Sequence, residues 1–375
     1  MKDLIWIEVS KSAVINNFKQ LRKIVGKGVV LSVAVKANAY GHGIKEISKL
    51  LVKNGADWLA VNSTEEAETL RNDGIKKPIL IMGFVQKKDL AKVVNLSARI
   101  FLYDMSTAEE LSKIALKKDK KANVHIKADT GLSRLGVLPY DVLSFANELK
   151  KMKGIHIEGI ATHFATNDDG KDGGFFKAQL ETFRNIANTL NKNGIKNLMI
   201  NGSNSAAAVI CGGLGFNIIR IGIAVYGYHS SEYVKNHCKK NKIKFIPALS
   251  LKTKVAQVKE IGKGSCVSYG CNFISKKKMK IAILPVGYYD GLDRKLGNNG
   301  YVLIKGEKAK IVGRVCMNMM VVDVSGIADV SPEDEVVLIG KQGGLEITAD
   351  DIAKQTDTIN YEVLARLRES IKRYY

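Results

Sequence analysis

The stretch Val33-Ala34-Val35-Lys36-Ala37-Asn38-Ala39-Tyr40-Gly41-His42-Gly43 places a lysine at the end of a buried strand. The residues from 29 to 35 are almost all apolar, which is typical of a parallel strand covered on both faces. An ammonium group is costly to desolvate, so packing alone does not explain Lys36. At the C-terminal rim of a parallel barrel, a buried lysine is equipped for Schiff-base chemistry with a carbonyl cofactor. On this segment alone, a lysine that reaches from the strand end into solvent is an equal alternative.

A strand–helix rhythm follows the lysine strand. Ser63 and Glu66 predict a capping box at the start of one helix, and Gly74 followed by Pro78 predicts where that helix ends. The eight strand candidates are Leu31–Val35, Trp58–Val61, Ile79–Met82, Ile100–Tyr103, Val124–Ile126, Ile157–Ala161, Leu198–Ile200 and Ile218–Ile221. Eight strands that alternate with helices predict an α/β fold, a (β/α)8 barrel.

The character of the sequence changes near residue 241. The later runs are short, β-branched and separated by turns, which is typical of a mostly-β domain. They are Lys252–Val258, Lys280–Leu284, Tyr301–Ile304, Lys310–Val315, Met320–Val324 and Glu335–Ile339. A closing helix is expected from Thr348, capped with Asp351, toward Arg368. We therefore expect a barrel domain over residues 1–240 and a β-rich domain over 241–375, with a first strand near residues 4–9 that may belong to the second sheet.

Composition narrows the function classes. The net charge of +21 suggests a protein that binds nucleic acid. The lysine clusters, however, are not accompanied by a helix-turn-helix, a zinc finger or interleaved aromatic residues. We therefore expect the clusters to lie in solvated loops, and we expect no nucleic-acid partner. No signal-peptide core or membrane-length apolar run is present, which favours a cytoplasmic protein without a membrane partner. The five cysteines are odd in number and form no CxxC pair, which favours reduced thiols and no metal site.

Polar residues fall at five of the expected strand ends. They are Lys36, the stretch from Lys127 to Arg134, His163, Asn204-Ser205, and Arg220 with Gly222-Ile223. A single buried histidine or arginine is usually structural, but five groups at one rim indicate an active site. The hydroxyl of Ser205 and the amides of Gly222 and Ile223 are suited to cradle a phosphate. If Arg220 faced the nitrogen of a pyridine ring, that nitrogen would stay unprotonated, because arginine offers only hydrogen-bond donors.

The sequence resembles the alanine racemases, pyridoxal-phosphate enzymes that interconvert L- and D-alanine, over nearly its whole length. Besides the opening stretch, the segments that carry the resemblance are 125–136 (HIKADTGLSRLG), 162–165 (THFA), 204–207 (NSAA), 220–227 (RIGIAVYG), 267–270 (VSYG), 285–288 (PVGY), 313–317 (GRVCM) and 359–362 (INYE). Their order and spacing match the family pattern.

The resemblance implies a two-base mechanism in a homodimer with shared active sites. Lys36 would carry pyridoxal 5'-phosphate and act as the base on one face of the alanine Cα. Tyr269 of the partner subunit would be the base on the other face, supported by His163. The product would be D-alanine for peptidoglycan.

The remaining site residues follow from the same resemblance. The implied cofactor-binding residues are Lys36, Tyr40, His163, Asn204, Ser205, Arg220, Gly222, Ile223 and Tyr361. Of these, Arg220 would hold the ring nitrogen, and the phosphate would be held by Tyr40, Ser205, Gly222, Ile223 and Tyr361. Arg134 would contact the cofactor phenolate and the substrate carboxylate, and Met317 of the partner subunit would contact that carboxylate through its backbone. Lys127, often carbamylated in the family, would position Arg134.

The chain departs from the family pattern at a few positions. Asn318 replaces the usual aspartate and is expected to alter substrate preference or the charge near Tyr269. The other departures are Asn201 for histidine, Ile221 for proline, Tyr289 for a small residue, and Leu292-Asp293 for Tyr-Pro. They are interpreted as packing and entrance changes.

Two other functions stay open. One is a racemase of the same mechanism that acts on serine or a larger amino acid. The other is a non-enzymatic pyridoxal-phosphate-binding protein, a class that lacks the β domain. The VSYG and CM segments argue against it, and a barrel-based decarboxylase is disfavoured because its second-domain cysteine motif is missing.

Overall fold

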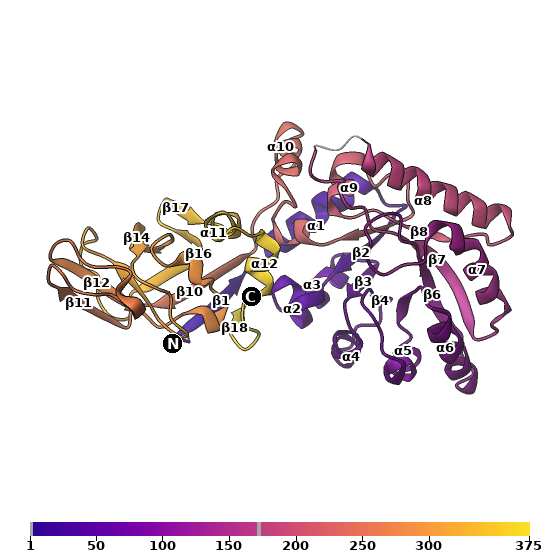
Figure 1. Cartoon of the computed structure of the whole chain (residues 1–375), viewed down its shortest axis with the longest axis horizontal. Helices are drawn as coiled ribbons and strands as arrows, with labels where there is room; N and C mark the ends of the chain where they lie inside the picture. Colours follow the sequence, from indigo (N-terminus) through magenta and orange to yellow (C-terminus); the bar gives the residue numbers. More distant parts are fainter. Residues whose placement is uncertain (1–2, 171–173) are drawn as a thin grey trace. The chain divides into compact units, whose positions relative to one another are not determined.

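The computed structural model describes residues 3–170 and 174–375. Met1, Lys2 and residues 171–173, which the expected barrel domain includes, lie outside the described residues. The chain divides into two units, coloured by sequence position in Figure 1. The barrel unit comprises Ser12–Ala39 and Ile44–Ile246, and the strand-rich unit comprises Met1–Lys11, Tyr40–Gly43 and Pro247–Tyr375.

The barrel unit is built on a parallel eight-stranded sheet in the order β8-β7-β6-β5-β4-β3-β2-β9. Its strands are β2 (Val30–Ala34), β3 (Trp58–Val61), β4 (Ile79–Ile81), β5 (Arg99–Leu102), β6 (Ala122–Lys127), β7 (Ile155–Ala161), β8 (Met199–Asn201) and β9 (Ile218–Ile221). A parallel bridge between Ser203 and Ile219 joins the two ends of this sheet. All eight predicted strands are present, and the predicted barrel is confirmed.

Amphipathic helices alternate with these strands and lie outside them (Figure 1). They are α1 (Lys11–Val25), α3 (Ile44–Lys53), α4 (Thr64–Asn72), α5 (Leu90–Asn95), α6 (Met105–Lys117), α7 (Val142–Lys151), α8 (Phe175–Lys192), α9 (Ser205–Cys211) and α10 (Glu232–Lys240). In α3, for example, the buried residues Ile44, Ile47 and Leu51 recur at helical spacing and form one apolar face.

The strand-rich unit contains a ten-stranded sheet with the path β11-β12-β15-β14-β13-β16-β10-β1-β18 and β17 paired with β16. Its strands are β1 (Ile5–Val9), β10 (Leu249–Lys254), β11 (Gln257–Ile261), β12 (Met279–Leu284), β13 (Tyr301–Ile304), β14 (Glu307–Ile311), β15 (Met320–Asp323), β16 (Glu335–Gln342), β17 (Leu345–Ile347) and β18 (Lys372–Tyr374). The first strand, β1, pairs antiparallel with β10 and parallel with β18.

Three sequence predictions in this unit were wrong in detail. The run expected at 252–258 is two strands, because the chain leaves β10 after Lys254 and enters β11 at Gln257. The strand expected at 310–315 is β14, which ends at Ile311. The closing helix is two helices, α11 (Ala349–Thr356) and α12 (Asn360–Ala365), since Asp357 adopts a left-handed conformation with φ of 56°. The predicted capping box between Thr348 and Asp351 is confirmed.

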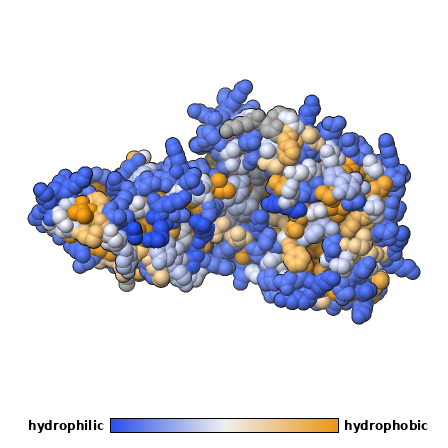
Figure 2. All heavy atoms as spheres, in the orientation of Figure 1, coloured by the Kyte–Doolittle hydropathy of each residue, from blue (hydrophilic) through white to orange (hydrophobic). Residues whose placement is uncertain are grey.

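Figure 2 shows one face of the molecule, on which hydrophilic residues predominate and apolar residues lie among them. Among the described residues, no helix combines the length and the apolar character needed to cross a membrane.

A buried charged network joins three neighbouring strands of the barrel. Glu158 on β7 accepts hydrogen bonds from Arg99 on β5, at 3.0 and 3.1 Å, and lies 3.3 Å from Nε2 of the buried His125 on β6. The Arg99 guanidinium also stacks over the ring of Trp58, 4.9 Å from its centroid. Burial by itself raises the pKa of Glu158, but the hydrogen bonds from His125 and Arg99 lower it to about 2. The carboxylate therefore stays charged and holds the three strands together.

We expect Glu158→Gln to lower the free energy of unfolding by about 2 kcal/mol at neutral pH, because hydrogen bonds to a charged group are lost. The folded pKa lies below the ordinary 4.5, so this stabilisation is full above about pH 4.5 and is lost as the pH falls toward 2. Urea unfolding of both proteins between pH 7 and pH 3 measures the difference.

Glu148→Gln is the matched control, since Glu148 forms an exposed pair with Lys151 on α7. It should change stability by less than about 0.5 kcal/mol. A Glu158→Gln loss that stayed the same from pH 7 to pH 3 would show that the charge plays no part.

Candidate active site

The segment that carries Lys36 has an uncommon backbone. Lys36 follows two residues after β2, and the next four residues, Ala37 to Tyr40, all have left-handed φ values between 52° and 53°. This conformation costs about 1–2 kcal/mol per non-glycine residue. The turn persists only if surrounding groups stabilise it.

Glu66 is one stabilising group on the barrel side. Its Oε1 accepts a hydrogen bond from the Ala37 amide at 2.7 Å, and its Oε2 accepts one from the Asn62 amide at 2.6 Å. The capping-box prediction was therefore half wrong: Ser63 caps α4 by accepting from the Glu66 amide, but the Glu66 carboxylate turns toward the lysine segment. Sequence reasoning missed this role because Ser63-x-x-Glu66 already had a sufficient local explanation.

Five basic side chains gather where the barrel strands end. They come from the C-terminal ends of strands β2, β6, β7 and β9 or from the loops that follow, and are Lys36, Lys127, Arg134, His163 and Arg220. Burial and the nearby Arg134 lower the pKa of Lys36, while Glu66 raises it. Burial, then Arg220, holds the pKa of Lys127 well below its usual value. We call this cluster the basic rim, and its members are close enough to lower one another's pKa values.

Arg220 is fixed by carbonyl groups on neighbouring strands. One Nη donates to the Asn201 backbone oxygen at 2.9 Å and also to its side-chain oxygen, and the other donates to the Thr162 oxygen at 2.9 Å. The second Nη also lies 3.2 Å from Nδ1 of His163. Because arginine has no acceptor, Nδ1 accepts and the His163 proton resides on Nε2. Burial and Arg220 lower the pKa of His163 to about 2, so this ring is neutral.

A small polar cradle follows strands β8 and β9. The Gly222 amide donates to Oγ of Ser205 at 2.8 Å. Asn204 caps α9 by accepting from the Ala207 amide at 3.0 Å, and its side chain pairs with that of Asn167. Ile223 begins the 3-10 turn that comes next. The structure thus brings the expected phosphate-binding residues of the barrel unit together.

Two further expected phosphate ligands meet in the strand-rich unit. The rings of Tyr40 and Tyr361 lie with centroids 6.0 Å apart, and burial raises the pKa of Tyr40 to about 12. Residues Tyr40–Gly43 are held by the other end of the chain: Nε of Arg373 donates to the Gly41 oxygen at 3.0 Å, and the Tyr375 hydroxyl donates to the His42 oxygen at 2.9 Å. We call this contact the Tyr375 clamp. Sequence reasoning did not find it, because no motif marks the pairing of such distant residues.

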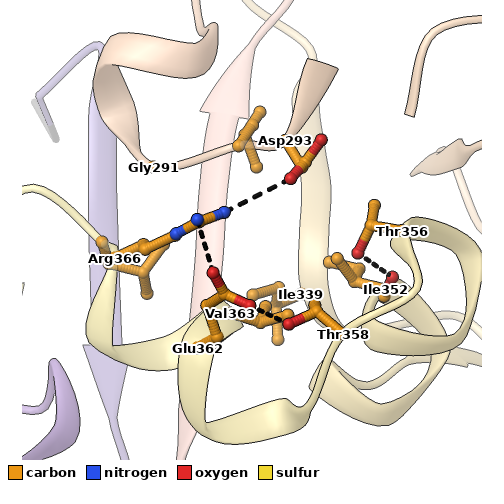
Figure 3. A pocket seen from close by; sticks show the side chains of 11 residues that line it. Gly291, Asp293, Ile339, Ile352, Thr356, Thr358, Glu362, Val363 and Arg366 are labelled. Atoms are coloured by element: carbon orange, nitrogen blue, oxygen red, sulfur yellow. Dashed lines mark hydrogen bonds and ion pairs between the residues drawn. The ribbon is translucent and has the colours of Figure 1, made fainter. Parts of the chain in front are cut away.

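A small pocket lies beside α12, which carries Tyr361 (Figure 3). Arg366 bridges Glu362 and Asp293 across it, and Thr358 donates to Glu362. Asp293 also accepts from the Lys295 amide at 2.8 Å. The departure from the family pattern at Asp293 thus has a structural reason, because the aspartate anchors the helix through Arg366. The departure at Tyr289 is similar, since the Arg368 guanidinium stacks 4.7 Å from the Tyr289 ring.

Tyr269, Met317 and Asn318 are exposed on the strand-rich unit. Tyr269 begins a 3-10 turn, and the preceding Ser268 donates through its hydroxyl to the Arg314 oxygen at 2.7 Å. The Met317 oxygen accepts from the Tyr289 amide at 3.0 Å. The segments that carry Tyr269 and Met317 therefore lie against each other.

Cys266 and Cys271, which lie on either side of Tyr269 in the sequence, form a disulfide. The prediction that all thiols are reduced was wrong, since the two cysteines lie across one tight turn with Cα atoms 5.0 Å apart, close enough to bond. The free cysteines are Cys211, Cys238 and Cys316.

Comparison with known proteins shows which family the chain belongs to. The family model "Alanine racemase, N-terminal domain" matches residues 9–230, and "Alanine racemase, C-terminal domain" matches residues 248–375. The chain belongs to the alanine racemase family. It is 40% identical over 371 residues to "Alanine racemase 2" of Caldanaerobacter subterraneus subsp. tengcongensis, covering 98% of this chain and 94% of that protein.

Solved structures agree with this family. The alanine racemase of Clostridium difficile 630 matches with a TM-score of 0.92 and 34% identity, covering 100% of this chain and 96% of that one. The alanine racemase of Bartonella henselae, solved with covalently bound pyridoxal phosphate, matches with a TM-score of 0.86 and 26% identity, covering 100% and 99%.

The residues present fit the cofactor of this family. The basic rim is opposed by few carboxylates, with Glu66 acting on Lys36 and Asp129 on Lys127, so it suits a ligand with several negative charges. The lowered pKa of Lys36 gives a larger share of neutral amine, the form that reacts with a carbonyl. Ser205 and Gly222 supply hydroxyl and amide groups of the kind that bind phosphate.

We expect Glu66→Gln to destabilise the left-handed turn, because an amide group accepts at one atom only and presents its NH2 to the second backbone N–H. The free energy of unfolding should fall by about 1–3 kcal/mol. Hydrogen exchange should accelerate at the Ala37 amide, which peptide-level mass spectrometry or NMR detects.

Glu65→Gln is the matched control, since Glu65 is an exposed neighbour in the same helical turn. It changes the charge near the helix N-terminus equally without touching the lysine segment. Equal exchange at Ala37 in the two variants would contradict the role given to Glu66.

Proposed function

We infer that the protein interconverts L-alanine and D-alanine with pyridoxal phosphate as its cofactor. The observation that carries this inference is Lys36 itself: the lysine of the family motif lies at a strand end inside the basic rim, with its pKa lowered by burial. Family matches that extend over both units support the activity. When bound, pyridoxal phosphate supplies the electron sink that stabilises negative charge at the substrate Cα.

Lys36 holds the cofactor and moves a proton on one face of Cα. A base must be neutral at working pH to accept a proton, and the depressed pKa of Lys36 brings the amine toward that state. Glu66 holds the Lys36 segment in its left-handed turn, which directs the amine from the strand end. The geometry of this turn therefore fixes the position of the first base.

Tyr269 of the partner subunit is the base on the opposite face of Cα. Two bases on opposite faces of one carbon must approach from different directions, and a homodimer with shared sites provides this arrangement. His163 supports that tyrosine, because its Nε2 carries the proton and is available to donate to an oxygen. The large exposed fraction of Tyr269 in the single chain, 72%, agrees with a residue that acts outside its own subunit.

The other site residues bind and orient the cofactor and the substrate. Arg220 donates to the ring nitrogen, and its carbonyl anchors keep the guanidinium in place. The phosphate is held by Tyr40, Ser205, Gly222, Ile223 and Tyr361, and Asn204 also binds the cofactor. Arg134 contacts the phenolate and the substrate carboxylate, which the Met317 backbone of the partner subunit also contacts.

Two further residues, Lys127 and Asn318, support these contacts. Lys127, whose pKa is held well below its usual value by burial and by Arg220, is suited to react with carbon dioxide and give a carbamate that positions Arg134. Asn318 adjusts the charge near Tyr269.

The wider assignment has three parts. Residues 1–240 form the cofactor-binding domain and 241–375 the domain that completes the partner's site, a division that the family matches at 9–230 and 248–375 support. The protein acts in the cytoplasm. It supplies D-alanine for peptidoglycan.

The activity is tested by D/L interconversion assays on alanine, serine and lysine. We expect alanine to be the preferred substrate, and borohydride-treated holoenzyme to carry the pyridoxyl group on Lys36. Lys36→Arg should abolish both the adduct and the activity, whereas Lys45→Arg, at an exposed position of α3, should preserve both. A higher rate on serine or lysine would reassign the substrate, and an adduct on another lysine would overturn the role of Lys36.

The shared site is tested by mixing two inactive variants, Lys36→Ala and Tyr269→Phe. In a mixed dimer one site lacks both bases and the other regains both. About half of randomly exchanged dimers are mixed, so roughly a quarter of the wild-type activity should return.

Native mass spectrometry reports whether mixed dimers form. Mixed dimers as inactive as the parent proteins would refute the shared site. The control mixes Lys36→Ala with Lys36→Arg, which has no intact site in any dimer and should recover nothing.

A further inference from the structure

The turn that presents Tyr269 is a short disulfide-closed ring. The Cys266–Cys271 bond joins residues five positions apart, and both cysteines are exposed. Within this ring Ser268, Gly270 and Cys271 have φ of 65°, 73° and 46°. Left-handed backbone is unfavourable for Ser268 and Cys271, so the ring closure compensates for a conformation that the free chain would rarely hold.

The ring rests on the segment that leads to Met317. The Ser268 hydroxyl donates to the Arg314 oxygen and lies 3.3 Å from Sγ of Cys316. The Cys266 sulfur lies 3.7 Å from the Ser268 oxygen. The disulfide and a third, free thiol therefore surround one serine, and each of these groups fixes the backbone next to Tyr269.

Tyr269 depends on this backbone for its position. Its side chain is 72% exposed in the single chain, so packing within the chain contributes little to its orientation. The disulfide at its two ends and the hydrogen bond from Ser268 to Arg314 hold the backbone of the turn. A base that must approach one face of a carbon atom loses rate steeply when it is misplaced by as little as 1 Å.

We propose that Cys266 and Cys271 form a thiol–disulfide site that sets the racemisation rate through the position of Tyr269. The reacting partner is a low-molecular-weight thiol of the glutathione class. Two such thiols reduce the bond: the first thiolate attacks one cysteine sulfur and releases the other as a thiolate, and the second resolves the mixed disulfide. Two electrons pass to the protein, two protons complete its thiols, and the reductant leaves as its own disulfide. The oxidised form is the faster enzyme.

The chemistry of the site agrees with reversible use. Both sulfur-bearing residues are exposed in the single chain, and exposure is typical of labile rather than structural disulfides. Cytosolic disulfides are usually transient or redox-sensing, so the proposed cytoplasmic location makes this bond a candidate for exchange. The inference rests on the proposed role of Tyr269 as a base.

The test compares oxidised and dithiothreitol-reduced holoenzyme. We expect reduction to lower kcat about tenfold with little change in KM, and to accelerate hydrogen exchange across residues 266–274. Reoxidation with oxidised glutathione should restore both. Differential alkylation and peptide mass spectrometry assign the bonded cysteines.

Variants separate the site from general thiol effects. Cys266→Ser/Cys271→Ser should have the low kcat and the fast exchange of the reduced enzyme, and should not respond to dithiothreitol. Cys211→Ser, which removes an exposed free thiol in the barrel unit, should behave as wild type. If the double variant does not fold, chemical reduction of the wild-type enzyme still gives the result.

The outcomes distinguish this proposal from the proposed function. Equal kcat in the two redox forms of an active racemase, or Cys266 and Cys271 found as thiols after oxidation, overturns the redox site alone. An oxidised protein with the mapped disulfide and slow exchange but no racemase activity overturns the proposed function instead.

Discussion

The concentration of positive charge in the basic rim is the constraint on which the site depends. Lys36, Lys127, Arg134, His163 and Arg220 come from separate parts of the chain, and only the closed barrel brings them together. Cations at close range in a poorly hydrated site repel one another and lose solvation. His163 does not add to this charge, because its pKa falls to about 2, and the pKa of Lys127 falls far below its usual value. An anionic ligand relieves what remains, so cofactor affinity and barrel stability are coupled.

Much of this fold could be predicted from the sequence, because buried parallel strands are visible in it as apolar runs. The run that ends before Lys36 and the alternation that follows it predict the barrel without further information. In the strand-rich unit, short strands and tight turns made the ends of the strands hard to predict. The apolar pattern continues through Val255-Ala256, for example, where the chain leaves one strand and enters the next. At Asp357 a left-handed residue ends a helix whose apolar spacing runs on into the next one.

The candidate site was predictable to a lesser degree. Strand ends and family motifs identified the groups that would touch ligands, but the supporting groups were hidden. Glu66 had a local explanation as a capping residue, and its bond to the Ala37 amide spans 29 positions. The cysteine pattern led to a wrong prediction, because an odd count without CxxC pairs does not show that two sulfurs face each other across a turn. Side-chain pairing across a fold follows from three-dimensional proximity, which sequence spacing does not encode.

The Tyr375 clamp has a consequence for how the protein is made. Arg373 meets the Gly41 oxygen across 332 positions of sequence, and Tyr375 meets the His42 oxygen across 333. At ordinary rates of translation, the ribosome needs on the order of tens of seconds to add that many residues. During this interval the nascent chain contains Lys36 but not the groups that hold the loop that follows it. Residues 41 and 42 are therefore held in this way only after residues 373–375 have been added, and a chain that stops before them would lack both contacts.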